Sequence, residues 1–154
     1  MQEKELLREL GEGTLYSAKG HFKACDTRRV IITITIWSCA ILNVIALLGI
    51  LSWVDKIIAV ISLLGLISLL IWNEGEGKKY RARHKVVAEK YLSLHKEARA
   101  LYFLNDSAIR EIEVLSNRVM ALDQSEKPDI HSFARKMAKR AIEKKGETDK
   151  WFLK

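Results

Sequence analysis

The chain divides sharply into one apolar stretch and two charged flanks. Residues 30–73 carry only two charged side chains, Asp55 and Lys56, whereas residues 1–29 and 74–154 are densely charged. A soluble domain mixes apolar and polar residues at helical or strand spacing, so this segregation indicates two solvents, water and lipid. The pattern therefore predicts a membrane protein whose apolar stretch lies in the bilayer.

Two spans fit the apolar stretch better than one. Residues 30–54 provide 25 uncharged positions and residues 57–73 provide 17, and about 20 apolar residues cross a hydrocarbon core. One helix through the whole stretch would place Asp55 and Lys56 near its middle, at a cost of at least about 2.5 to 3.5 kcal/mol per charge. We therefore predict a first span at 30–54, an extracytoplasmic turn at 55–56 and a second span at 57–73.

Basic residues crowd both edges of the apolar stretch, which is typical of cytosolic flanks. Residues 1–29 thus form a cytosolic segment, and we expect its helix to begin near Thr14, after the Gly11-Glu12-Gly13 break. The net charge of +7 is concentrated at these edges and in a basic tail, without a nucleic-acid motif. We therefore expect the lipid bilayer, and no specific nucleic acid, as a partner.

Residues 74–125, after the second span, follow a heptad pattern. Apolar or aromatic residues fill eleven of thirteen positions spaced by four and three, as in a coiled-coil seam. Of the two polar positions, His84 is predicted to be a solvated or packed seam residue. Asn105 either sets the register or starts a new helix after a bend, together with Asp106 and Ser107. The predicted oligomerisation seam comprises Tyr91, Leu94, Leu101, Ile112, Leu115 and Val119.

Residues 126–154, which include the chain's single proline, Pro128, are predicted to form a basic amphipathic helix. Two placements remain open. The helix could lie on the anionic inner leaflet with Trp151 and Phe152 as interfacial anchors, or it could pack on the coiled coil. Its apolar face combines Ile130, Phe133, Met137 and Ala141.

Catalytic signatures are missing from the sequence. The two Gly-Glu-Gly stretches lack the spacing of phosphate loops, and the four histidines lack partners at metal-ligand spacing. The two cysteines would lie about 21 Å apart on one helix, too far for a disulfide. We expect no enzyme, no cofactor and no metal.

Small and mildly polar residues form a stripe in each span. Such stripes let helices pack closely, but they could also line a pore formed by several subunits, because two helices alone cannot enclose a channel. Asn43 stands out, since its amide needs a partner helix or water near the middle of the bilayer. The candidates for packing or pore lining are Thr35, Ser38, Cys39, Asn43, Ala46, Gly49, Ser62 and Gly65.

Four charged residues should lie level with one another at the inner membrane face. Arg28 and Arg29 end the first flank, while Glu74 and Glu76 begin the second. We hypothesise that they form ion pairs across the hairpin, each contributing about 0 to 1 kcal/mol if exposed.

The stretches YSAKGHFKACDTRR before the first span and YRARHKVVAEKYLSLHKEARALY after the second resemble the SLATT family. These are two-transmembrane effector domains associated with SMODS-type nucleotidyltransferases and SLOG sensors in bacteria. The resemblance covers roughly residues 14–125. It rests on the overall layout and on Tyr16, Ala18, His21, Ala24, Tyr91 and Leu94.

The resemblance implies an effector of bacterial antiviral or conflict defence that oligomerises, perforates the inner membrane and causes cell death or growth arrest. Its trigger is expected from a protein partner, a nucleotide-signalling system encoded nearby or a ligand at the coiled coil. A non-conducting adaptor, whose coiled coil docks a soluble sensor or enzyme, is the alternative. The expected fold is an all-α, two-transmembrane helical hairpin with a long cytosolic coiled-coil extension, a C-terminal basic helix and both termini cytosolic.

Overall fold

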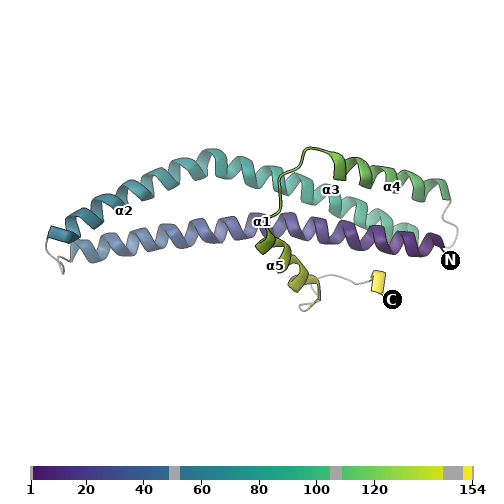
Figure 1. Cartoon of the computed structure of the whole chain (residues 1–154), viewed down its shortest axis with the longest axis horizontal. Coiled ribbons are helices and arrows are strands. Elements are labelled where there is room, and N and C mark those ends of the chain that lie inside the picture. The colour runs from purple at the N-terminus through teal and green to yellow at the C-terminus, as the bar shows by residue number, and fades with distance from the viewer. Residues whose placement is uncertain (1, 49–52, 105–108, 144–150, 154) are drawn as a thin grey trace. The chain divides into compact units, whose positions relative to one another are not determined.

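The computed structural model is all-helical in the residues that it describes, which are 2–48, 53–104, 109–143 and 151–153 (Figure 1). The predicted all-α class is therefore confirmed for this part of the chain. The elements are α1 (Gln2–Leu47), α2 (Trp53–Trp72), the π-helical turn η1 (Asn73–Gly77), α3 (Lys78–Phe103), α4 (Ile109–Gln124), α5 (Ser132–Glu143) and the 3-10 turn η2 (Trp151–Leu153). They divide into two compact units, which we name the bundle unit (Met1–Cys25 and Ala82–Lys154) and the apolar unit (Asp26–Arg81).

Two helices are long and apolar enough to cross a membrane: α1, and the helix that runs from α2 through η1 into α3. Only 6% of the most apolar window of each is buried within the protein. Neither window is therefore buried as in the core helix of a soluble domain, and large side chains such as Trp37, Leu64 and Ile71 stand exposed. A continuous apolar surface of this kind is unfavourable in water.

The predicted turn at Asp55 and Lys56 is wrong, because both residues lie in the first turn of α2, which begins at Trp53. Neither Gly nor Pro separates Trp53 from Lys56, so the local sequence can continue as a helix. Gly49, by contrast, is of the residue type that commonly ends helices. Residues 49–52 lie outside the described residues, and the candidate Gly49 lies there with them.

The predicted helix start near Thr14 is also wrong, since α1 begins at Gln2 and passes through Gly11 and Gly13. Gly11 has a packing role. A Cβ atom built on it would lie 2.4 Å from Cζ2 of Trp151, so an aromatic ring contacts the helix backbone there. A glycine inside a helix costs about 1 kcal/mol, and burial of this ring offsets that cost.

Asn73 lies where η1 widens the helix, at the predicted end of the second span. A Cβ atom on Gly77 would lie 2.8 Å from Oδ1 of Asn73, so the glycine leaves room for this side chain. The same Oδ1 accepts a hydrogen bond from Nη1 of Arg81, 2.8 Å away. The helix therefore continues through η1 into α3 instead of ending in a loop.

The predicted single helix over residues 74–125 is interrupted in the structure. α3 ends at Phe103 and α4 begins at Ile109, which agrees with the alternative of a new helix after a bend. Asn105, Asp106 and Ser107 themselves lie outside the described residues.

α4 runs antiparallel to α3 within the bundle unit. Nη1 of Arg118 on α4 donates to both carboxylate oxygens of Glu97 on α3, at 2.5 and 2.7 Å. Farther along α4, the Asp123 carboxylate accepts a hydrogen bond from the Tyr91 hydroxyl, at 2.5 Å. The later residue on α4 thus pairs with the earlier one on α3, as in an antiparallel pair.

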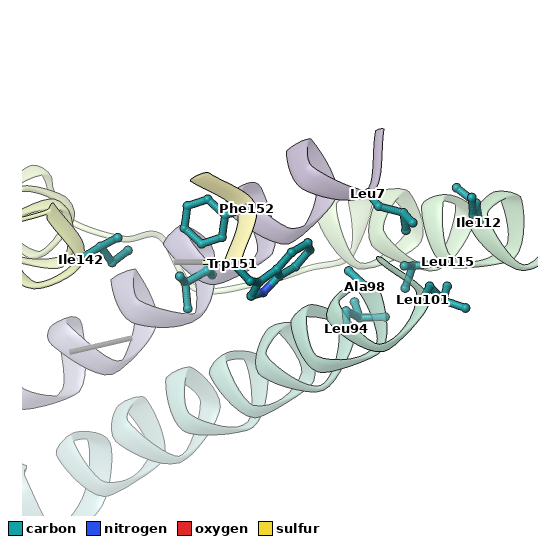
Figure 2. Packing of buried hydrophobic residues seen from close by; sticks show 10 residues of the cluster. Leu7, Leu94, Ala98, Leu101, Ile112, Leu115, Ile142, Trp151 and Phe152 are labelled. Atoms are coloured by element: carbon teal, nitrogen blue, oxygen red, sulfur yellow. The ribbon is translucent and has the colours of Figure 1, made fainter. Parts of the chain in front are cut away.

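The heptad face is buried as predicted, but by helices of the same chain. Leu94, Leu101, Ile112 and Leu115 share one apolar cluster with Leu7 of α1 (Figure 2). Leu15 belongs to the same cluster, Tyr91 is buried, and Val119 packs against the cluster. This placement corrects the predicted oligomerisation seam, because a face filled by the chain's own helices is not free to join subunits.

α5 is shorter than the predicted helix over residues 126–154, and its buried face agrees with the predicted one at Ala141 but differs at Phe133. Phe133 is exposed, and α5 instead packs through small side chains, which allow close approach. Trp151 and Phe152 lie in the bundle core, so their predicted role as interfacial anchors is wrong. Packing on the bundle is the alternative that the structure shows. The buried residues of α5 are Ala134, Ala138, Ala141 and Ile142.

Candidate functional site

Two buried histidines face each other between α1 and α3. His21 is 1% exposed and His84 is 0% exposed, and their Nδ1 atoms lie 2.8 Å apart. One Nδ1 must donate and the other must accept, so the two rings cannot both carry a proton at this position. His84 is therefore a packed residue, which is one of the two roles expected for it.

His21 is neutral at pH 7. Burial first, and then the nearby His84 and Lys127, lower the pKa of His21 from 6.5 to about 4. Burial acts in this direction because it disfavours the charged imidazolium. His21 thus enters the pair as a neutral imidazole.

A hydrogen-bonded triad, Tyr91, Asp123 and Lys127, adjoins this pair. The Tyr91 ring stacks on His21, with ring centroids 6.0 Å apart and an interplanar angle of 15°. The Tyr91 hydroxyl donates to Oδ1 of Asp123. Nζ of Lys127 donates to the Tyr91 hydroxyl at 2.6 Å and to Oδ1 of Asp123 at 2.8 Å.

The triad contains a charged pair and a neutral phenol. Burial and the hydrogen bond to Asp123 raise the pKa of Tyr91. Burial alone would raise the pKa of Asp123 and lower that of Lys127. The hydrogen bonds among the three groups outweigh burial, so the pKa of Asp123 is lowered and that of Lys127 is raised. At pH 7 an ion pair therefore holds the Tyr91 hydroxyl in place.

A cavity of about 390 Å³ opens beside His21 and Tyr91, with walls from α1, α3, α5 and the segment before α5. Its volume falls within the range of small-ligand sites. Its charged lining residues are Lys127, Arg135, Lys139 and Asp129. The lining is therefore basic, although Lys127 is already paired with Asp123, and Nζ of Lys139 lies 3.7 Å from Oε1 of Glu143. The cavity thus has the size and the charged lining of a small-ligand site.

The stability of the bundle is expected to fall between pH 6.5 and 4 because of His21. Above pH 6.5 the His21 ring is neutral in both the folded and the unfolded chain. As the pH falls toward 4, the unfolded chain binds a proton that the folded chain excludes, which lowers the free energy of unfolding by up to about 1.4 kcal/mol per pH unit. Guanidinium unfolding of the detergent-solubilised protein across this range measures the slope.

His21→Asn should flatten this slope, whereas His131→Gln should keep it, because His131 is exposed. Equal slopes in the two variants would show that His21 does not exclude the proton.

The predicted stripe of the first span is split between exposed and half-buried positions of α1. Thr35 and Ser38 are exposed, whereas Cys39, Asn43 and Ala46 are half-buried. The Asn43 amide donates to the Cys39 carbonyl oxygen at 2.8 Å, and the Thr35 hydroxyl donates to the carbonyl oxygen of Ile31 at 2.9 Å. Both polar groups therefore have a hydrogen-bond acceptor within their own helix.

The candidates on α2 are split in the same way. Ser62 is buried, and its hydroxyl donates to the carbonyl oxygen of Ala59 at 3.1 Å. Gly65 is exposed, and a Cβ atom built on it would contact nothing within 4 Å. Ser62 is thus a packing residue, whereas Gly65 leaves a small gap on the outer face.

The charged residues at the predicted inner face have partners other than those expected. The Arg28 guanidinium lies over the rings of Trp72 and Tyr80, 4.2 and 4.0 Å from their centroids, which is a cation–π arrangement. Arg29 is exposed. The hypothesis of ion pairs across the hairpin is therefore corrected. Glu74 pairs with Lys78, and Glu76 pairs with Lys79 at 3.1 Å.

Sequence reasoning missed the polar core. His21 was singled out only by resemblance and His84 only by its heptad position. Asp123 and Lys127 have the i, i+4 spacing of a helical ion pair, but α4 ends at Gln124, and no local pattern shows that both reach Tyr91.

Among the described residues, no group of three or more His, Cys, Asp or Glu is placed to hold a metal ion. Comparison with known proteins found no matching family model, no matching curated protein and no matching solved structure.

Proposed function

We propose that the chain is an integral protein of the bacterial inner membrane, with a two-span hairpin formed by α1 and α2 and with both termini in the cytosol. The exposed apolar side chains of the apolar unit carry this proposal. Lipid is the solvent in which such a surface is stable. The basic edges of the apolar stretch support the orientation.

The hairpin is proposed to oligomerise into a membrane-disrupting pore, as an effector of bacterial antiviral or conflict defence that kills the cell or arrests its growth. This step rests on the resemblance to the SLATT family. Thr35, Ser38 and Gly65, which are exposed in the single chain, are the residues that a neighbouring subunit or a water-filled path would meet first. A protein partner or a nucleotide-signalling system supplies the trigger, and the basic cavity is where a small anionic signal would bind.

A second candidate function is that of a non-conducting adaptor, in which the hairpin only anchors the bundle unit. Asn43 favours it, because this residue is half-buried and its amide already donates within α1. A donor satisfied in this way needs no water-filled path beside it.

Replacing Asn43 separates the two functions. In a pore, Asn43→Leu removes a polar lining group, so depolarisation of cells on induced expression should fall at least about tenfold, as expected where an apolar constriction dewets. Thr33→Val, also an exchange of a polar residue on α1 but outside the stripe, is the matched control. A voltage-sensitive dye reports the result. Normal membrane potential with the wild-type chain and its neighbouring genes present would exclude the pore and leave the adaptor.

A further inference from the structure

Trp151 occupies a site on α1 and α3 that has room for its indole ring and an acceptor for its single side-chain donor, the indole N–H. The residue is 1% exposed although it belongs to a turn of only three residues. Its indole Nε1 donates to Nε2 of His95 at 3.3 Å. Its ring lies 5.7 Å from the His95 ring and 5.0 Å from the Tyr102 ring, between centroids.

The hydrogen bonds of His95 define which of its two ring nitrogens carries the hydrogen. Its Nδ1 lies 2.8 Å from the carbonyl oxygen of Gly11, and a carbonyl can only accept, so Nδ1 bears the hydrogen. An indole N–H can only donate, so Nε2 must offer its lone pair. His95 is thus held as the neutral tautomer that can receive a tryptophan.

Gly11 gives the ring its room. A Cβ atom at this position would lie 2.4 and 2.6 Å from two ring carbons of Trp151, whereas a Cβ atom at Gly13 would meet nothing within 4 Å. Both glycines stand inside α1 and carry the same cost in helix propensity. Only at Gly11 does another side chain, that of Trp151, approach the backbone of α1 closely.

The neighbouring residue is held by the same two helices. Phe152 is 3% exposed, and its carbonyl oxygen accepts a hydrogen bond from Nε of Arg8 at 2.6 Å. Its ring meets the His95 ring edge-on, with centroids 6.4 Å apart. Arg8 lies on α1 and His95 on α3, so the segment bridges the two helices.

We propose that Arg8, Gly11, His95 and Tyr102 form a peptide-binding socket and that Trp151–Phe152 of the same chain is its internal ligand. Trp151 and Phe152 contact the socket through their own two side chains and through the Phe152 carbonyl oxygen, all on one three-residue turn. A docked peptide is held in the same way. A competing ligand must be a peptide segment with an indole N–H donor. When the socket is filled, α1 and α3 are tied together; when it is vacated, their aromatic and apolar walls are free. The docking does not depend on what the apolar unit does.

Two glycine substitutions test the docked state in the full-length protein. Gly13→Ala should raise the melting temperature of the detergent-solubilised protein by a few degrees, because alanine favours the helix and meets open space. Gly11→Ala should lower it by at least as much, because its methyl group collides with Trp151. Stabilisation of similar size by both variants would overturn the docking.

A peptide added in trans tests the socket as a binding site. The probe is a fluorescein-labelled peptide of residues 147–154, with anisotropy as the signal and far-UV circular dichroism as the folding check. The double variant Trp151→Ala with Phe152→Ala, which has lost both side chains of the internal ligand, should bind it at least about 100-fold more tightly than the intact chain, in which the covalently linked segment competes at millimolar effective concentration. Adding Gly11→Ala to this variant should abolish binding. Equal binding to the intact chain and the double variant, or no binding to a folded double variant, would overturn the proposal.

Discussion

Leu64→Arg is expected to remove most of the protein from the membrane fraction. Leu64 lies near the middle of α2 and is 60% exposed in the single chain. If lipid covers it, an arginine there costs about 2.5 to 3.5 kcal/mol, which lowers an insertion equilibrium by roughly two orders of magnitude. Alkaline extraction of isolated membranes followed by immunoblotting measures the retained fraction.

Met120→Arg is the matched control, since Met120 is exposed to a similar degree, 56%, but on α4 of the bundle unit. At a water-exposed position this substitution should change the free energy of unfolding by no more than about 0.5 kcal/mol. The control should therefore stay in the membrane fraction. Equal retention of both variants would mean that the Leu64 side chain does not face lipid.

Leu115→Ala is expected to destabilise the bundle by about 2 to 5 kcal/mol, the usual cost of a cavity at a fully buried leucine. Leu115 is 0% exposed in the single chain. Because its neighbours belong to the same chain, the loss should be independent of protein concentration. Denaturant unfolding at two concentrations, with light scattering for the oligomeric state, separates this outcome from dissociation of an oligomer.

Val114→Ala controls for the loss of side-chain volume on the same helix. Val114 is 50% exposed, so its truncation should change stability by no more than about 0.5 kcal/mol. If Leu115→Ala instead dissociated an oligomer and left the unfolding of the single chain unchanged, the seam would join subunits as the heptads first predicted.

The heptad pattern predicted the buried face of α3 and α4 but not what covers it. Leu94 and Leu115 obey the same spacing whether the partner helix belongs to another subunit or to the same chain. A heptad reports which side of a helix is apolar, and the identity of the neighbour depends on the break between Phe103 and Ile109. That break, signalled in the sequence by polar residues alone, turns one long coiled coil into an antiparallel pair.

Glycines were the least predictable feature of the chain. Gly11 and Gly13 have the same appearance in the sequence, and their local spacing suggests a break in the helix. The structure keeps both in α1, and Trp151, 140 positions farther along, packs on Gly11 alone. A contact at such distance in sequence leaves no local signal, and the same holds for the pairing of His21 with His84.

Labelling of single cysteines from the two sides of the membrane tests the two-span topology most directly. In a chain whose Cys25 and Cys39 are replaced by serine, a cysteine at Leu48, beside the end of α1, should react with a membrane-impermeant maleimide in spheroplasts. A cysteine at Ser125, beyond α4, should react only after the membrane is permeabilised. Labelling of both positions from the same side, or release of the wild-type chain by alkaline extraction, would contradict the two-span topology.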